Sequence, residues 1–157
     1  MSPVASDEMS LLEFRLDGHR FGIACDLVVE VLPMLPVSQL PLAPEAILGV
    51  VSVRGTLLPL LDPRPRLGLA GWVASSSAHI VWVRAGDRAV GLVVDSAEDV
   101  FSVQLKNVCR PGALEPRVPY SLALVRRGSV EVVVIDIDAL VTHDEWRGVA
   151  NAIDGAQ

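Results

Sequence analysis

The sequence is poor in aromatic residues and in cysteine, and each scarcity narrows the possible folds. Aromatic residues make up 4% of the 157 positions while hydrophobic residues make up 51%, so the core must be built mainly from valine, leucine, isoleucine and alanine. Such a composition favours β-strands. The two cysteines, Cys25 and Cys109, lie outside any CxxC or Cys/His motif, which argues against a disulfide framework or a zinc site. We expect reduced thiols and no bound metal.

Basic residues are also in deficit. The chain carries 19 acidic and 13 basic residues, for a formal net charge of −6, which opposes the electrostatic footprint of a protein that binds nucleic acid or an anionic membrane. The N-terminus lacks the basic start and the apolar stretch of a signal peptide, and no apolar run approaches the length of a membrane helix. We therefore expect a cytoplasmic protein that binds no nucleic acid and does not insert into a membrane.

Short apolar runs separated by turn residues recur along the chain, a pattern typical of a barrel or sandwich of short strands. Every hairpin candidate has a glycine at its turn, where a positive φ angle is often needed. The expected strands, with one-turn helices as an alternative for the third and fourth, are residues 11–16, 20–24, 28–32, 47–53, 56–61, 80–83, 89–94, 100–103, 122–125 and 130–135.

The second half of the sequence repeats a pattern of the first. Residues 22–26 followed by Glu30 match residues 91–95 followed by Asp99, with identical spacing. A second pair of segments follows in the same order, each with an Arg-Gly turn, an apolar strand and a terminal aspartate, and these are residues 54–62 and 127–136. Two matched pairs in one order indicate two similar β units. We expect a pseudo-two-fold axis that superposes Gly22 on Gly91 and Asp26 on Asp95.

Residue types that carry out catalysis are few and do not assemble into a motif. The three histidines share no metal-binding or catalytic spacing, and no nucleophile elbow, Walker loop or G-x-G-x-x-G sequence is present. Asp62, Asp136 and Asp138 end apolar runs, where they are well placed to cap a following turn of helix. Cys25 lies within an apolar run and is expected to be an inert core residue. We therefore expect a protein that is not an enzyme.

A binding function is centred on residues 52–62, where Arg54 precedes a glycine turn between two strongly apolar runs. An arginine at such a turn can lay its stem on hydrophobic surface and offer its guanidinium to a partner. Arg64 and Arg66 follow closely and would add a basic patch that suits an acidic protein partner. Two alternatives stay open for Arg54: a plain turn residue, or an internal ion pair with a carboxylate such as Asp62.

At these residues the sequence resembles the CheW family. The family pattern, roughly N-x-R-G-x-x-x-P-[VI]-x-D-L, is matched at Arg54, Gly55, Pro59 and Asp62. Further matches are residues 21–23, 28–31, 40–44, 49–51 and 91–95, so that the resemblance spans about residues 10–142. The chain departs from the pattern at Ser52, where Asn is usual, and at Pro63, where Leu is usual. Because Pro63 removes a backbone donor and restricts the preceding residue, we expect a reshaped exit from that strand.

The resemblance implies an all-β fold with short helices, in which two packed five-stranded SH3-like barrels are related by pseudo-two-fold symmetry. It implies a non-enzymatic adaptor, without a cofactor, that couples methyl-accepting chemotaxis receptors to a CheA-type histidine kinase in bacterial signal transduction. One face would contact the cytoplasmic tip of the receptor and another the regulatory domain of the kinase, at receptor arrays on the inner membrane. The alternative is an adaptor of a non-flagellar pathway, such as gliding or pili, that lacks one of the usual contacts.

Matching positions carry the family's contact residues onto this chain. They imply receptor-binding residues at Val28, Gly49, Arg54 and Gly55, and a kinase-binding residue at Glu30. Each of these residues also has an alternative role that involves no partner. Val28 could be a core residue, and the two glycines could be required by the backbone conformation. Glu30 could be a solvated strand residue.

The expected organisation is a single CheW-like domain over residues 10–142. It would consist of two β subdomains, at about residues 10–70 and 79–142, joined by a Ser-rich stretch. Residues 1–9 would be a flexible N-terminus and residues 143–157 a C-terminal helix or tail.

Overall fold

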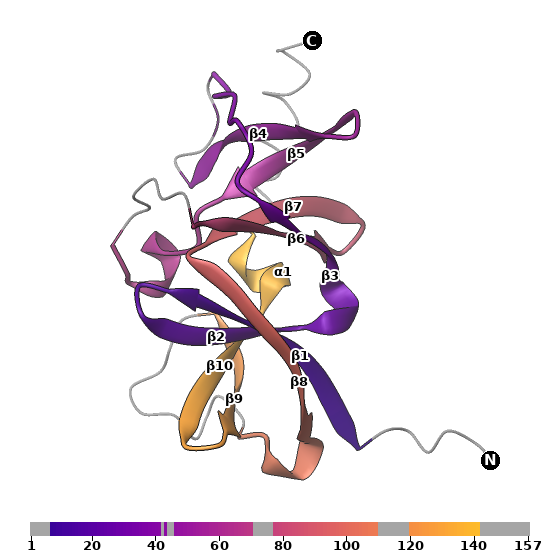
Figure 1. Ribbon diagram of the computed structural model, residues 1–157, viewed down its shortest axis with the longest axis vertical. Helices are drawn as coiled ribbons and strands as arrows, with labels where there is room; N and C mark the ends of the chain where they lie inside the picture. Colours follow the sequence, from indigo (N-terminus) through magenta and orange to yellow (C-terminus); the bar gives the residue numbers. More distant parts are fainter. Residues whose placement is uncertain (1–6, 42, 44–45, 71–76, 110–119, 142–157) are drawn as a thin grey trace, which may run out of the picture.

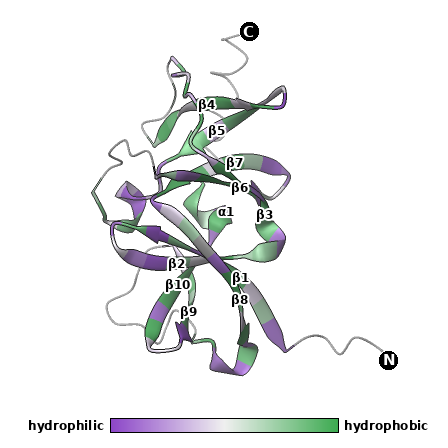
Figure 2. Cartoon of the chain, viewed as in Figure 1, coloured by the Kyte–Doolittle hydropathy of each residue, from purple (hydrophilic) through white to green (hydrophobic). Residues whose placement is uncertain are grey.

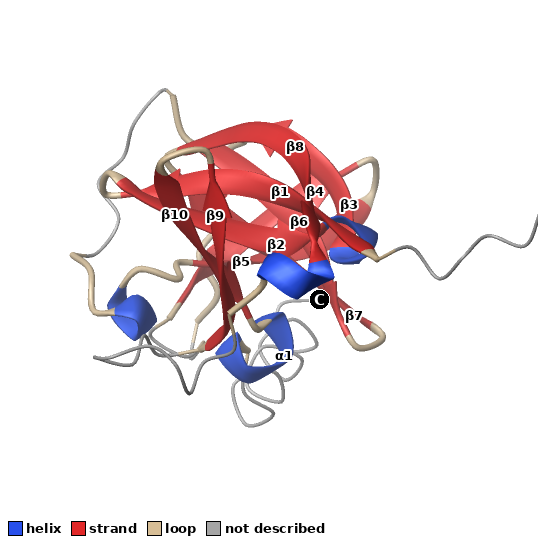
Figure 3. Cartoon of the chain, turned by 90° about the horizontal axis from the view of Figure 1, so that it is seen from below, coloured by secondary structure: helices blue, strands red, loops and turns tan. Residues whose placement is uncertain are grey.

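The structure is a computed structural model in which residues 7–41, 43, 46–70, 77–109 and 120–141 are described. Strands make up most of this part of the chain (Figure 3). The strands are β1 (Glu8–Leu16), β2 (His19–Ala24), β3 (Val28–Pro33), β4 (Ile47–Val53), β5 (Thr56–Leu61), β6 (His79–Ala85), β7 (Arg88–Val94), β8 (Ser96–Gln104), β9 (Ser121–Arg127) and β10 (Val130–Ile135). The helical elements are the one-turn 3-10 helices η1 (Cys25–Leu27), η2 (Pro65–Leu67) and η3 (Leu105–Asn107), and the α-helix α1 (Ile137–Leu140).

The strands form two five-stranded sheets that share one topology. The first, barrel A, has the order β8-β1-β2-β10-β9, and the second, barrel B, has the order β3-β6-β7-β5-β4 (Figure 1). In barrel A the pair β2–β10 is parallel and the other pairs are antiparallel. In barrel B the pair β5–β7 is parallel and the others are antiparallel. The expected all-β fold with two related five-stranded barrels is therefore confirmed.

The chain changes barrel after the second strand of each half. β3 follows β2 of barrel A but pairs with β6 of barrel B, and β8 follows β7 of barrel B but pairs with β1 of barrel A. Barrel A therefore combines β1 and β2 with β8, β9 and β10, and barrel B combines β3, β4 and β5 with β6 and β7, which differs from the expected division at about residues 10–70 and 79–142. β8 thereby covers the β1 edge of the β1–β2 hairpin, and β3 covers the β6 edge of the β6–β7 hairpin.

The repeat found in the sequence is confirmed by equivalent elements. Gly22 lies in β2, opposite β1 and beside β10, and Gly91 lies in β7, opposite β6 and beside β5. Both glycines allow a neighbouring strand to approach, because an added Cβ would lie 3.2 Å from Val132 Cγ1 at Gly22 and 2.8 Å from Leu60 Cδ2 at Gly91. The aspartates that follow these strands stand where the chain crosses from one barrel to the other.

The largest hydrophobic cluster lies between the two barrels and takes side chains from both. It joins Phe14 and Phe21 of barrel A to Leu61 and Leu92 of barrel B. α1 packs into the same cluster and sits between the barrels (Figure 1). Hydrophobic residues run along β4 and β5, whereas the tip of their hairpin is hydrophilic (Figure 2). Each barrel also has a smaller cluster of its own, but neither barrel alone could bury the residues of the shared cluster.

The ends of the chain and the Ser-rich stretch fall largely outside the described residues. β1 begins at Glu8, so the last two residues of the expected flexible segment 1–9 are in a strand. Residues 1–6, 71–76 and 142–157 lie outside the described part, and with them the expected C-terminal helix or tail. Within the described residues, no helix combines the length and the apolar character needed to cross a bilayer.

Candidate interaction surface

The β4–β5 hairpin turns at Arg54 and Gly55, and both residues have positive φ angles, 49° and 85°. A two-residue turn of this kind normally takes Asn, Asp or Gly at its first position. The β1–β2 hairpin follows that rule with Asp17 at φ 51° and Gly18 at φ 80°. An arginine in the left-handed region costs about 1 kcal/mol or more. A side chain kept at such a position is a candidate for function.

Arg54 forms a two-pronged ion pair with Glu30 of β3. Arg54 Nη2 lies 3.0 Å from Glu30 Oε1, and Nη1 lies 3.2 Å from Oε2. The side chains remain 66% and 34% exposed, so the pair contributes less than about 1 kcal/mol to folding. β3 and β4 are the two edge strands of barrel B, so the pair spans the seam between them.

This ion pair joins two residues that the sequence resemblance assigns to different partners, the receptor for Arg54 and the kinase for Glu30. Sequence reasoning missed the contact, although it allowed an internal partner for Arg54. The partner named as an example, Asp62, instead pairs with Arg64. The repeat relates one half of the chain to the other, whereas Glu30 and Arg54 lie in the same half, so the repeat gave no sign that they meet.

Exposed apolar residues are next to Glu30 in the sequence of β3. Val29 and Val31 flank Glu30 in β3 and are both exposed, as is Leu57 in β5. The register of β3 against β6 shifts between Val28 and Glu30, and such bulges at sheet edges re-aim side chains. An exposed arginine and exposed aliphatic residues at one sheet edge suit a protein–protein interface.

Val28 and Gly49 occupy less accessible places than Arg54 and Gly55. Val28 is half-buried and packs against the shared hydrophobic cluster. Gly49 is buried at φ 150°, where an added Cβ would lie 2.4 Å from the carbonyl oxygen of Ser38. At Gly55, by contrast, an added Cβ would meet nothing within 4 Å. The structure thus brings Arg54 and Gly55 close to Glu30 at the surface, while Gly49 lies buried near the other end of β4, against Ser38.

The expected basic patch after β5 is absent from the surface, and that prediction is wrong. Arg64 is 3% exposed and pairs with Asp62, which is 4% exposed, and with Asp95. Arg66 donates to the carbonyl oxygen of Leu140 at the end of α1, and burial lowers the pKa of its guanidinium. The carboxylates of Asp62 and Asp95 neutralise the Arg64 guanidinium, which allows it to be buried.

Of the three aspartates expected to cap a following turn of helix, only Asp136 does so, since Asp62 precedes η2 without capping it and Asp138 lies within α1. Asp136 is the N-cap of α1, and its Oδ1 accepts a hydrogen bond from the Ala139 N–H at 3.2 Å. The Oδ1 of Asp62 accepts from the Arg64 N–H at 3.0 Å. This second bond turns the chain directly after β5, next to Pro63, and so shapes the exit from that strand.

Barrel A carries a seam contact equivalent to the Arg54–Glu30 pair. Arg127 of β9 lies 3.4 Å from Asp99 of β8, and Asp99 is the repeat counterpart of Glu30. Arg127 also pairs with Glu13, which is 1% exposed, at 3.3 Å, and its guanidinium stands over the ring of Phe101 at 4.7 Å. Arg127 is therefore held by Asp99, Glu13 and the Phe101 ring. Arg54 is the more exposed of the two arginines and pairs with Glu30.

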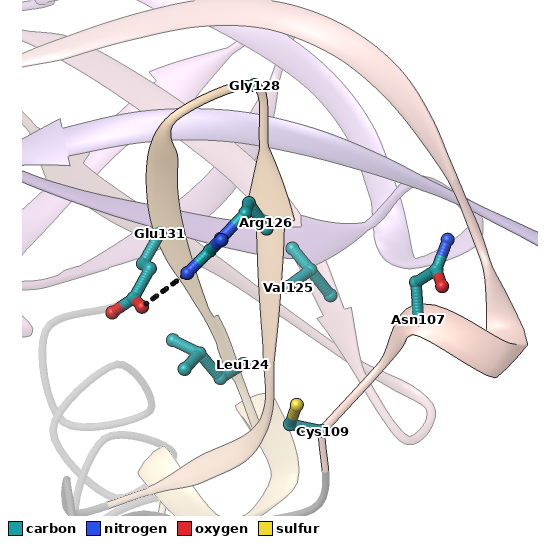
Figure 4. A pocket seen from close by; sticks show the side chains of 7 residues that line it. All are labelled: Asn107, Cys109, Leu124, Val125, Arg126, Gly128 and Glu131. Atoms are coloured by element: carbon teal, nitrogen blue, oxygen red, sulfur yellow. Dashed lines mark ion pairs between the residues drawn. The ribbon is translucent and has the colours of Figure 1, made fainter.

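A pocket of about 480 Å³ lies beside the β9–β10 hairpin of barrel A (Figure 4). Its lining includes Cys109, Leu124 and the exposed ion pair of Arg126 with Glu131. Cys109 is an exposed free thiol, and Cys25 is a half-buried one whose pKa is raised by burial and by the charge of Asp26.

Titratable side chains do not assemble into a reactive centre in the part of the chain described here. No group of three or more His, Cys, Asp or Glu residues lies close enough together to hold a metal ion among these residues. The chemistry that this surface can perform is recognition by ion pairing and apolar contact.

A sequence comparison identifies the family. Residues 10–145 match the CheW-like domain, on a chain whose fold pairs two five-stranded barrels around a shared core. The chain belongs to the CheW-like domain family. The resemblance deduced over about residues 10–142 is thereby confirmed.

Relatives of this CheW-like domain carry one name. The chemotaxis protein CheW of Klebsiella aerogenes is 28% identical over 143 residues, covering 89% of this chain and 86% of the relative. The chemotaxis protein CheW of Treponema pallidum is 24% identical over 154 residues, covering 94% and 91%. Among solved structures, the scaffolding protein TtCheW from Thermoanaerobacter tengcongensis superposes with a TM-score of 0.79 at 20% identity, covering 87% of this chain and 94% of its own. At that identity the likeness shows the fold.

Proposed function

We propose that this CheW-like protein is a cytoplasmic, non-enzymatic adaptor that couples chemoreceptors to a CheA-type histidine kinase. Its relatives are named chemotaxis proteins, and the similar solved structure is described as a scaffolding protein. The observation that carries the proposal is the exposed Arg54–Glu30 pair at the edge of barrel B, where Val29 and Val31 of β3 are exposed as well. This arrangement offers both a charge and apolar area to a protein partner, in keeping with an adaptor.

The receptor-binding residues in this proposal are Arg54 and Gly55 at the hairpin tip, together with the half-buried Val28 of β3 and the buried Gly49 of β4. The guanidinium of Arg54 binds a carboxylate or a helix-end carbonyl at the cytoplasmic tip of the receptor. Gly55 leaves open space at the turn through which a helix can approach. Gly49 contributes through the backbone, because it fixes the position of β4 beneath Ser38.

The kinase-binding surface in this proposal includes Glu30, which binds the regulatory domain of the kinase. Because Glu30 and Arg54 hold each other in the free protein, a receptor group that takes Arg54 leaves the Glu30 carboxylate available for a new partner. Binding of one partner therefore changes the affinity for the other, and by linkage the effect is reciprocal. The ion pair gives the adaptor a physical route between its two surfaces.

Isothermal titration calorimetry tests this function with two soluble partners, a receptor signalling-tip fragment and the kinase regulatory domain. The wild-type chain should bind each partner alone and both together. Arg54→Ala should lose receptor affinity, and Glu30→Lys should lose kinase affinity. The matched control is Arg126→Ala, which removes an exposed arginine of the β9–β10 hairpin that also pairs with a glutamate. Failure of the wild-type chain to bind either partner would overturn the proposal.

A further inference from the structure

The chain crosses between the barrels twice, at equivalent positions of the repeat. The first crossing passes through η1 and Asp26, between β2 of barrel A and β3 of barrel B. The second passes through Asp95, between β7 of barrel B and β8 of barrel A. Each crossing is a covalent link between the same two bodies. The contacts around Asp26 and Asp95 can therefore be compared directly.

Asp95 is bonded to barrel A by both its backbone and its side chain. Its N–H donates to the carbonyl oxygen of Arg15 in β1 at 2.9 Å. Its Oδ2 accepts a hydrogen bond from the N–H of Asp17, in the β1–β2 turn, at 2.6 Å. The remaining oxygen, Oδ1, accepts from Nη2 of Arg64. One carboxylate thus joins a hairpin turn of barrel A to an arginine that follows β5 of barrel B.

Arg64 is itself anchored to barrel B. Its N–H and its Nη1 both donate to Asp62 Oδ1, at 3.0 Å and 3.1 Å. Nη1 also lies 3.4 Å from the carbonyl oxygen of Val93 in β7. Because the guanidinium is planar and its donors are fixed in direction, the groups that it binds are held in direction as well. The burial of Arg64 keeps water from competing for these bonds.

The bonds from Asp62 through Arg64 and Asp95 to Asp17 form a latch between the barrels at the second crossing. Within the described residues the first crossing has no such latch, for a reason visible in the sequence. Asp62 and Asp136 follow the equivalent strands β5 and β10, and two residues after each stand Arg64 and Asp138. An aspartate in place of the arginine has no donor to offer a second carboxylate. Within the described part of the chain, the exposed Asp26 carboxylate forms no ion pair, although its carbonyl oxygen accepts from Arg84 Nη2 at 2.8 Å.

We propose that Arg64 is a positioning residue that fixes the orientation of barrel A relative to barrel B, through Asp95. The shared hydrophobic core drives the barrels together but is non-directional. The chain of bonds from Asp62 through Arg64 and Asp95 to Asp17 adds a defined direction on one side of the molecule. The unlatched crossing at Asp26 is the compliant side. The latch thereby sets the angle between the two barrels.

Residual dipolar couplings of backbone N–H groups test the proposal, because they report the orientation of each barrel separately. In the wild-type protein, couplings from both barrels should fit one alignment tensor. Asp95→Asn keeps one acceptor oxygen, which cannot serve both Asp17 and Arg64. Arg64→Lys keeps the charge but loses the fork that reaches two carboxylates. In both variants the couplings should fit each barrel well by itself and should require two tensors of different orientation for the pair.

Asp26→Asn is the matched control, since it makes the same chemical change at the equivalent crossing and should leave a single tensor. A merely stabilising role for Arg64 would lower the melting temperature without separating the tensors. One tensor of wild-type orientation in both Arg64→Lys and Asp95→Asn would overturn the proposal, as would an equal effect of Asp26→Asn. If Arg64→Lys does not fold, Asp95→Asn decides, because the Asp95 side chain is 42% exposed. No signalling partner enters the measurement, so its result is independent of the proposed function.

Discussion

Arg54 and Glu30 stand 24 residues apart in the chain and meet as a two-pronged ion pair across the seam of barrel B. Nη2 donates to Oε1 at 3.0 Å and Nη1 to Oε2 at 3.2 Å. The pair is exposed, so its contribution to folding is small. It nevertheless holds both side chains at the surface in defined positions.

Reversal of the charge at residue 30 should weaken kinase binding and leave the fold intact. Glu30→Lys places a second cation beside Arg54, and because the site is exposed the free energy of unfolding should fall by no more than about 1 kcal/mol. Calorimetry with the kinase regulatory domain measures the binding loss. Unchanged affinity would remove Glu30 from the interface. The double variant Glu30→Arg with Arg54→Glu restores the internal pair but should not restore binding, because both partners then meet the wrong charge.

Truncation of Arg54 should impair receptor binding without unfolding the protein. If the guanidinium is desolvated at the centre of the contact, Arg54→Ala should cost about 2–5 kcal/mol of binding free energy, a loss of about thirtyfold or more. Arg54→Asn should match or exceed the wild-type melting temperature, since asparagine tolerates the positive φ of this turn. A clear fall in melting temperature with receptor binding retained would make Arg54 a structural residue.

Loss of the buried Arg64 charge should strongly destabilise the protein. Arg64→Met removes the guanidinium that pairs with the buried Asp62 carboxylate, and breaking a buried ion pair on one side costs about 3–5 kcal/mol. For a chain of this size the melting temperature should fall by on the order of 10 °C. Arg126→Met, which breaks an exposed pair with Glu131, is the control and should cost less than about 1 kcal/mol. Equal effects of the two changes in chemical denaturation would contradict the expectation.

The two glycines assigned to receptor binding should respond differently to alanine. At Gly49 an added Cβ would lie 2.4 Å from the Ser38 carbonyl oxygen, so the backbone must move. The hydrogen bonds that join Ser38 to Val50, at 2.9 Å and 2.8 Å, should then lose protection from hydrogen exchange. Gly55→Ala meets no atoms and should cost only the strain of a positive φ, about 1–2 kcal/mol. If Gly49→Ala keeps full protection at Ser38 and Val50, the backbone role of Gly49 is wrong.

The two thiols should differ in reactivity toward a maleimide under native conditions. Cys109 is exposed, whereas Cys25 is half-buried and its pKa is raised by burial and by the charge of Asp26. Because the thiolate is the reacting form, modification of Cys25 should be slow at neutral pH and should accelerate as the pH rises toward that raised pKa. Mass spectrometry of the Cys25→Ser and Cys109→Ser variants assigns each rate. Faster labelling of Cys25 than of Cys109 at neutral pH would contradict the structure.

Local features of the sequence determined most of the secondary structure. β4, β5 and β10 have the bounds that the apolar runs indicate, because strand ends are set by nearby glycines, prolines and charged residues. The repeat also survives in three dimensions, since Gly22 and Gly91 each admit a close neighbouring strand whichever barrel they are in. The Arg54-Gly55 turn was visible for the same reason, as was the cap made by Asp136. All of these depend on residues close in the chain.

Only the tertiary structure decided which segments meet. Strand pairing depends on which edges remain open after the hairpins form, and a period-two apolar pattern is the same for any partner, so the crossings of the chain into barrel B after β2 and back into barrel A after β7 could not be foreseen. The burial of Arg64 and the pairing of Arg54 with Glu30 depend on those crossings. The first crossing places β3 in the same sheet as the β4–β5 hairpin, and the second brings Asp95 to the β1–β2 turn. The sequence shows where an arginine and its charge are placed along the chain. Which carboxylate pairs with that arginine depends on contacts between residues far apart in the chain.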